Sequence, residues 1–271
     1  MRKVCSYRLS EVAGYINWIY FFHAWEMNGK PQESREALRQ EALALLRQWE
    51  AQYQTHAVFA LFDAWAEEDD IWLGGTRLPM LRQQRPGASG ACLSLADFVQ
   101  PRSMGKTDRV GAFAATVDAA MEKEHDGDDY RRMLAQTLAD RLAEATVERL
   151  HLEVRRQWWG YALDEQLSVD QLLREEFQGI RPAVGYPSLP DTSINFLLSE
   201  LLGMKEIGIY LTENGAMRPH ASVSGLMIAH PQAHYFDLGP IGEDQLADYA
   251  RRRGVPVAIM RRFLASSLIK K

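Results

Sequence analysis

The sequence predicts a mixed α/β (α+β) fold in a single domain, with a central, mostly antiparallel twisted sheet flanked by helices. Helix-like and strand-like segments alternate irregularly rather than in regular strand–helix units, which favours this class over a parallel sheet. The stretch HAVFALFDAWAEEDDIWL reads as two strands joined by an acidic turn. Because we find no repeat, no low-complexity tract and no dividing linker, we expect residues 1–271 to form one unit.

The first half of the chain contains the clearest predicted elements. Residues 34–52, SREALRQEALALLRQWEAQ, are rich in strong helix formers and predict an amphipathic helix. Strands are expected at residues 57–64 and 70–73. A helix is expected at residues 111–123, and the longest one at residues 128–158. That long helix carries one apolar stripe, formed by Leu134, Leu138, Leu142 and Ala145.

The second half is predicted to hold two helices and two strands. We expect a helix near residues 192–202, a strand at EIGIYLTE (206–213) and another at AHYFDLG (233–239). A last helix at residues 243–253 should face Leu246 and Tyr249 inward and stop at Gly254, because glycine readily adopts the left-handed conformation that ends helices.

Composition excludes several classes of protein. A net charge of −5 and a pI near 5.8 argue against a general nucleic-acid binder. Two cysteines are too few for a disulfide framework or a four-thiolate cluster. The apolar N-terminal run is interrupted by Glu11 and Asn17, and no segment approaches the ~20 apolar residues of a membrane span. We therefore expect a cytoplasmic protein with no nucleic-acid or membrane partner.

Common catalytic signatures are missing. The chain has no GxGxxG after a predicted strand, no P-loop, no GxSxG, no CxxC and no HExxH. His230 and His234 are four residues apart, but Pro231 between them argues against a helix, and no third ligand is evident. We expect no metal site.

The stretch RPAVGYPSLPD, residues 181–191, is stiffened by three prolines. A pre-ordered backbone loses less entropy when it binds a small molecule, and Gly185 lets the chain approach a ligand closely. Arg181 supplies a planar fork that suits a carboxylate. A proline-rich surface connector with a solvated arginine is the alternative reading of the same residues.

RPAVGYPSLPD resembles the RPxxGYPxxPD signature of the activation domain of cobalamin-dependent methionine synthase, the region that binds S-adenosylmethionine. Further blocks are similar to that family in the same order over about residues 7–264, and ordered blocks are far more specific than one motif. They are YINWIYFFHAWEMNGK (15–30), LADFV (95–99), GKTDRVGAFAAT (105–116), ADRLAEA (139–145), WGYA (159–162), EEFQGIRPAVGYP (175–187), LTENGAMRPHASVSG (211–225), HPQAHYF (230–236) and DYARRRG (248–254).

The resemblance implies a ligand site for S-adenosylmethionine. Arg181 would bind its carboxylate, and Ala183 with the backbone around Gly185 would contact the adenosine part. Tyr235 and Phe236 match an aromatic pair at the nucleoside end, although the two could equally be alternate faces of a strand. The family often has two tyrosines there, whereas Phe236 of this chain lacks the second hydroxyl.

The resemblance also implies acidic groups for the cationic end of the ligand. Glu144 and Glu175 match acidic family positions. The plainer reading makes Glu144 an exposed helix carboxylate paired with Arg141 or the neighbours of Glu148, and places Glu175 in the solvated charge run REE. Tyr186 looks like the tyrosine that faces cobalamin. Asn17 replaces the aspartate of YIDW, and losing that charge should weaken binding of a cation about tenfold or more.

The reaction that the resemblance implies is reductive reactivation of methionine synthase. Cob(II)alamin would be reduced by flavodoxin or a similar donor to cob(I)alamin, which takes the methyl group of S-adenosylmethionine. The chain has no DxHxxG, so cobalamin must come on a separate domain or chain, the cobalamin-binding domain of methionine synthase. We do not expect turnover by this chain alone. RRRG at residues 251–254 with Arg261, Arg262, Lys270 and Lys271 would suit an acidic donor, or would simply be solvated helix ends.

Two other functions stay open at this point. A scaffold homologue that kept the fold and lost the ligand would explain Asn17. A reactivator of another corrinoid methyltransferase is the other. The chain itself is compatible with a separately encoded protein and with a C-terminal region of a longer one.

Overall fold

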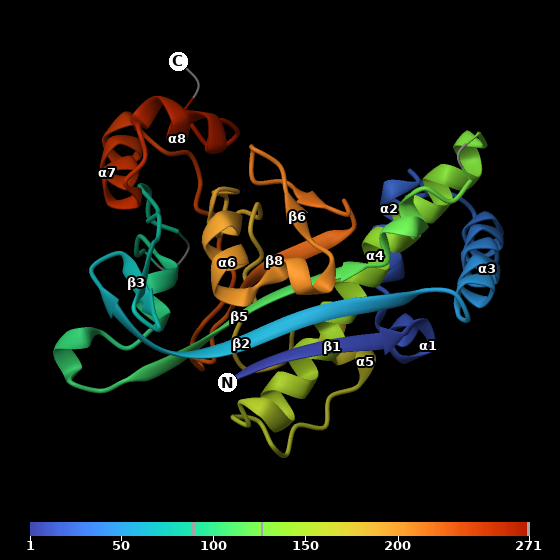
Figure 1. The fold of residues 1–271 in the computed structure, drawn as a ribbon, viewed down its shortest axis with the longest axis horizontal. Helices are drawn as coiled ribbons and strands as arrows, with labels where there is room; N and C mark the ends of the chain where they lie inside the picture. Colours follow the sequence, from blue (N-terminus) through green and yellow to red (C-terminus); the bar gives the residue numbers. More distant parts are fainter. Residues whose placement is uncertain (88–89, 126, 270–271) are drawn as a thin grey trace.

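A computed structural model describes residues 1–87, 90–125 and 127–269 of the chain. Its centre is an antiparallel sheet in the order β4-β3-β2-β5-β8, with β1 paired to β2 beside β3 (Figure 1). The strands are β1 (Arg2–Arg8), β2 (Gln54–Glu67), β3 (Asp70–Leu73), β4 (Thr76–Pro79), β5 (Asp108–Val117) and β8 (Ser222–Met227). The predicted mixed fold around an antiparallel sheet is confirmed.

Alternation along the strands divides the core into two halves. In the registered pair of β2 and β5, Phe59 lies opposite Phe113 and points to one face of the sheet. Val58 and Ala114, the next registered pair, point to the other face. Both faces are covered, so the central strands are apolar on both sides.

The first face is covered mainly by the long helix α4 (Asp129–Glu153), which contacts β2, β5 and β8. Asp128 begins this helix by accepting a hydrogen bond from the backbone N–H of Arg131. The four predicted stripe residues, Leu134, Leu138, Leu142 and Ala145, are all buried in this half of the core. A π-helical turn, Val154–Trp158, follows the helix.

The remaining helices surround this frame. Near one end of the sheet lie α1 (Leu9–Val12), α2 (Trp18–Ala24) and α3 (Gln32–Trp49), and α5 (Val169–Leu173) follows α4 along the chain (Figure 1). The second face is covered by α6 (Ile194–Leu202), beside the small ribbon of β6 (Tyr210–Leu211) and β7 (Met217–Arg218). The last helices, α7 (Glu243–Arg253) and α8 (Val257–Phe263), lie at the end of the molecule that holds β3 (Figure 1).

Several predicted helices are confirmed, and short 3-10 turns complete the chain. The helices expected at residues 34–52, 128–158, 192–202 and 243–253 correspond to α3, α4 with its π turn, α6 and α7. Leu246 and Tyr249 of α7 are buried, and Gly254 ends that helix with φ of 66°. The 3-10 turns are Ala13–Tyr15, Leu95–Phe98, Arg102–Met104, Ala119–Glu122 and Met204–Ile207. In the described part of the chain, no helix has the length and apolarity needed to cross a membrane.

The helix expected at residues 111–123 is wrong. This segment is the end of strand β5 followed by the 3-10 turn Ala119–Glu122. Its alanines predict a helix, but β5 is the strand between β2 and β8 and is buried on both faces, so it shows no alternation of polar and apolar residues. Small residues are needed here, because a Cβ at Gly111 would lie 2.5 Å from the ring of Phe59.

The two strands expected in the second half are largely wrong. Of residues 206–213 only Tyr210–Leu211 pair, because Gly208, with φ of 83°, ends the preceding turn and leaves little room for a longer strand. Residues 233–239 form no ladder. Their backbone instead meets loops and side chains, as where the N–H of Leu238 donates to the carbonyl of Pro187 and Gln83 donates to the carbonyl of Asp237.

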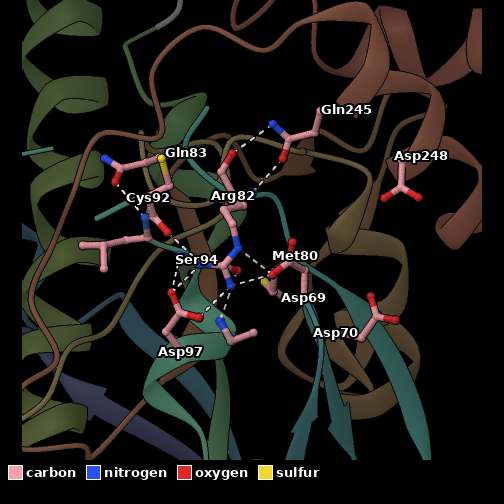
Figure 2. A network of polar contacts seen from close by, with 12 residues as sticks. Asp69, Asp70, Met80, Arg82, Gln83, Cys92, Ser94, Asp97, Gln245 and Asp248 are labelled. Atoms are coloured by element: carbon pink, nitrogen blue, oxygen red, sulfur yellow. Dashed lines mark hydrogen bonds and ion pairs between the residues drawn. The ribbon is translucent and has the colours of Figure 1, made fainter. Parts of the chain in front are cut away.

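A network around Arg82 attaches α7 to the β3–β4 end of the sheet (Figure 2). The Arg82 guanidinium donates to Asp69, to Asp97 and to the carbonyl of Cys92. Its backbone exchanges two hydrogen bonds with the side chain of Gln245 on α7, at 2.7 and 2.9 Å. The position of α7 is therefore fixed by contacts that are remote in the sequence.

Residues 180–184 form an added strand that extends the sheet beyond β8. The backbones of Ile180 and Ile228 exchange two hydrogen bonds, Leu226 N–H donates to the carbonyl of Pro182, and Val184 N–H donates to Ser224. Pro182 lacks an N–H, so this pairing is missing the one hydrogen bond that another residue at position 182 would donate to the carbonyl of Leu226. The approach is close, because a Cβ on Gly225 would lie 2.2 Å from the carbonyl oxygen of Pro182.

Gly225→Ala is therefore expected to push residues 180–184 away from β8 and to lower the free energy of unfolding by about 3 kcal/mol. Urea denaturation measures the loss. Gly14→Ala is the matched control, since a Cβ there meets nothing within 4 Å, and it should change stability by less than about 1 kcal/mol. Equal, small effects of both substitutions would show that the close approach at Gly225 does not exist.

Candidate functional site

A cleft lies between α4 and residues 181–188, built from two adjoining cavities of about 360 and 440 Å³. Pockets for small organic ligands are typically of this size. One cavity is lined by charged side chains and the other by apolar and aromatic ones. The residues that line both are Tyr20, Glu144, Glu175, Arg181 and Tyr186.

Three polar side chains of α4 face residues 181–186, beside β8. Glu144, Glu148 and His151 are spaced four and three residues apart, so they lie on one side of the helix. Glu144 contacts Tyr186, while Glu148 and His151 contact Arg181. The helix and the added strand thus meet through polar groups along one wall of the cleft.

Arg181 is nearly buried, with 12% of its side chain exposed, and its guanidinium has partners on several sides. Nη2 forms a hydrogen-bonded ion pair with Glu148, and Nη1 lies 3.4 Å from Nδ1 of His151. Burial alone lowers the pKa of Arg181, but Glu148 and neighbouring groups raise it above its usual value, so the side chain is a cation. Burial also raises the pKa of Glu148, an effect that Arg181 opposes.

Behind Arg181 lies a second buried cluster. The ring of Phe177 lies 5.3 Å from the Arg181 guanidinium and 4.1 Å from that of Arg155, and His151 packs edge-on against it at 4.9 Å. Arg155, in the π turn after α4, makes two hydrogen bonds to Glu165. Pairing offsets the cost of burying both charges. The cluster contacts Arg181 from behind, and none of its members lines either cavity.

Tyr186 lies at the mouth of the cleft with 51% of its surface exposed. Its hydroxyl donates to Glu144 at 2.8 Å. Partial burial, then the nearby carboxylate of Glu144, raise the pKa of Tyr186, so it stays a neutral donor. Glu144 is therefore paired across the cleft rather than along its own helix.

Ala183 and Gly185 have different roles. Ala183 lines the apolar cavity from the added strand. Gly185 does not line either cavity, and its φ of 91° instead allows the turn in which its N–H donates to the carbonyl of Leu189. The glycine shapes the loop that holds Tyr186.

Tyr235 and Phe236 close the apolar half of the cleft from a segment that follows β8. The Tyr235 hydroxyl accepts a hydrogen bond of 2.9 Å from the backbone N–H of Arg181. Phe236 packs near Phe98 with ring centres 6.4 Å apart. Residues 233–239 are not a strand, so the alternation of faces expected for one does not apply.

The charged half is bounded by Asn17 and Glu175. Asn17 begins α2, and its side-chain oxygen accepts a hydrogen bond from the N–H of Ile19 at 3.1 Å. Glu175 lies in a left-handed turn with φ of 59° and lines both cavities. Burial raises the pKa of Glu175, and Arg181 opposes that shift.

Residues 8–254 match the family described as "Vitamin B12 dependent methionine synthase, activation domain". The chain belongs to this family. A crystal structure of the MetH reactivation domain bound to AdoHcy is similar to it, with a TM-score of 0.93 and 36% sequence identity over 100% of this chain and 91% of that one.

Within this activation domain, eight of the nine residues expected at a ligand site line the cleft, and only Gly185 does not. Three other residues have roles here that were not predicted from the sequence. Glu148 and His151 contact Arg181, and Tyr20 lines both cavities beside Arg141. The four- and three-residue spacing of Glu144, Glu148 and His151 was the signal available for two of them.

Among the described residues, the basic cluster expected to receive an electron donor divides into exposed and buried arginines. Arg252 and Arg253 are buried, and they pair with Asp70 and Asp191 inside the protein. Arg261 pairs with Glu243 at the surface, and Lys270 and Lys271 lie outside the described residues. Arg252 and Arg253 thus stabilise the fold, while Arg251 and Arg262 are exposed.

The two histidines that were weighed as metal ligands lie in a segment without helix or strand. His230 and His234 both pack near the ring of Phe98. Over residues 1–87, 90–125 and 127–269, no group of three or more His, Cys, Asp or Glu side chains is arranged to hold a metal ion.

Proposed function

We propose that this activation domain binds S-adenosylmethionine in the cleft and presents its methyl group to cobalamin carried by a separate domain or chain, in reductive reactivation of methionine synthase. The observation that carries the proposal is a buried arginine at the junction of a carboxylate-lined cavity and an aromatic one. The similar reactivation domain bound to AdoHcy, S-adenosylhomocysteine, supports the same class of ligand.

The charged half suits the amino-acid end of this ligand. A guanidinium has five N–H donors, and Glu148 and His151 take one each from Arg181, so donors remain for a ligand carboxylate. Three glutamates, Glu144, Glu148 and Glu175, line the same cavity and suit an ammonium and a sulfonium.

The apolar half suits the nucleoside end. Phe113, Val147 and Val223 form its floor, and Tyr235 and Phe236 its side, so a flat heterocycle would lie against carbon. The edge of the added strand at Ala183 offers backbone groups for its polar atoms. The preformed strand reduces the entropy cost of this recognition.

The proposed step moves a methyl group and no proton. Cobalamin on the partner, reduced by one electron from flavodoxin or a similar donor, would supply the nucleophile that accepts the methyl group. The carbon–sulfur bond breaks with its electron pair left on sulfur, which becomes the neutral thioether of S-adenosylhomocysteine. Because no proton is transferred, the chain needs to supply orientation rather than an acid or a base.

Tyr186 and Tyr20 are the groups we assign to the partner's side of the cleft. They are 51% and 61% exposed, and both border the two cavities. Tyr186 is held in place by its hydrogen bond to Glu144. A planar corrin carried by a partner would meet these rings first.

Arg181→Lys tests the ligand assignment. Lysine keeps the charge but loses the planar fork, so affinity for S-adenosylhomocysteine should fall roughly tenfold or more in calorimetric titration. Arg251→Lys is the matched control, because Arg251 is 72% exposed on α7, lines neither cavity and pairs with Asp248 at the surface. It should bind as the unchanged protein does.

The same variants then test the reaction. Mixed with a cobalamin domain in the cob(II)alamin state, a reductant and S-adenosylmethionine, the Arg251→Lys protein should give the absorption spectrum of methylcobalamin and Arg181→Lys should give it more slowly. If the unchanged protein gives no binding heat at millimolar ligand, the result would support the second candidate, a scaffold that has lost the ligand. Asn17 favours that candidate.

Asn17→Asp separates these candidates further. Aspartate caps a helix as well as asparagine does, so α2 should be unaffected while the cleft gains a negative charge. Affinity for the sulfonium S-adenosylmethionine should rise about tenfold, with a smaller gain for the neutral thioether S-adenosylhomocysteine. An equal change for both ligands in titration would show that position 17 does not sense the sulfonium charge.

A further inference from the structure

We propose that His151 is a positioning residue, which holds the Arg181 guanidinium in the orientation that receives the ligand's carboxylate. The inference rests on the proposed function and adds a residue to that site. His151 does not line either cavity, so its action on a ligand must pass through Arg181.

The contacts of His151 define what each ring nitrogen does. Nδ1 lies 3.4 Å from Nη1 of Arg181, which can only donate, so Nδ1 is the acceptor. Nε2 then carries the proton and faces the hydroxyl of Tyr161 at 3.4 Å, and that hydroxyl donates to the carbonyl of Gln178 at 3.3 Å. The tautomer is assigned from these partners.

The charge of His151 fits this arrangement. The side chain is fully buried, and burial, followed by the nearby guanidinium groups of Arg155 and Arg181, lowers its pKa well below 6.5. A protonated imidazole would face Arg181 with an Nδ1–H that has no acceptor there, and its charge would repel the guanidinium. The neutral ring is therefore the state that can hold the arginine.

Arg181 is held from three directions that differ in chemistry. Glu148 binds Nη2 as a charge, His151 accepts from Nη1, and the ring of Phe177 lies 5.3 Å from the guanidinium. Phe177 is in turn packed against Arg155, whose guanidinium is fixed by Glu165. This chain of contacts runs from the protein interior to the cleft.

His151 gives a cleaner test of positioning than Glu148 does. Glu148 lines the charged cavity, so changing it also alters the charge that a ligand meets. His151 is neutral and hidden, so a substitution leaves the charge and lining of the cleft unchanged. Its effect should appear only with ligands that use Arg181.

Two substitutions with the same functional group distinguish orientation from mere polarity. His151→Asn places an amide oxygen at about the reach of Nδ1, toward Arg181. His151→Gln places it at about the reach of Nε2, toward Tyr161, and leaves Nη1 of Arg181 without an acceptor. The probes are S-adenosylhomocysteine and 5′-methylthioadenosine, which keeps the nucleoside and the sulfur but lacks the amino-acid end.

Calorimetric titration should give the unchanged protein and His151→Asn similar affinities for S-adenosylhomocysteine, with His151→Gln weaker by roughly tenfold. All three proteins should bind 5′-methylthioadenosine alike, which also shows that each is folded. If His151→Gln does not fold, Tyr161→Phe replaces it, because the loss of the hydroxyl frees the ring to turn. A weakening of a few-fold, confined to S-adenosylhomocysteine, is then expected.

Results that contradict the positioning role can be distinguished from results that contradict the proposed function. Equal affinity of His151→Gln and the unchanged protein for S-adenosylhomocysteine, or equal losses for both probes, overturns the positioning role alone. An unchanged protein that binds neither probe overturns the proposed function, and the role of His151 with it.

Discussion

The antiparallel pairing of residues 180–184 with β8 is the interaction on which the site depends. It turns a proline-rich connector into a strand, so Arg181 and Ala183 face α4 while Ile180 and Val184 pack into the other half of the core. The alternation of a strand thereby aims the arginine at one helix. The pairing in turn requires Gly225, where any side chain would meet the carbonyl of Pro182.

The cleft is assembled from segments that are distant in sequence. Asn17 comes from the start of α2, Glu144 and Glu148 from α4, and Tyr235 from the chain after β8. The far end of the signature is also anchored, because Asp191 accepts a hydrogen bond from Tyr249 of α7, which the Arg82 network attaches to the sheet (Figure 2). A site fixed at both ends is pre-organised for a small ligand.

Sequence reasoning succeeded where local pattern and tertiary environment agree. The stripe of α4 predicted its buried face, and the stiffness of RPAVGYPSLPD predicted an ordered segment. It failed for β5, because a strand buried on both faces loses the alternation that identifies strands, and for residues 233–239, whose partners are loops. The cleft residues came from the family resemblance. Glu148 and His151 were missed because a polar helix residue shows its partner only once α4 and Arg181 are brought together.

Amide hydrogen exchange of the ligand-free protein tests the central claim most directly, because it reports whether the added strand exists before a ligand arrives. The N–H groups of Ile180, Val184, Leu226 and Ile228 donate across the pairing. They should exchange as slowly as those between β5 and β8, and adding S-adenosylhomocysteine should change them little. Fast exchange at Ile180 and Val184 that slows only on adding the ligand would contradict the account, because the ligand would then be building the site.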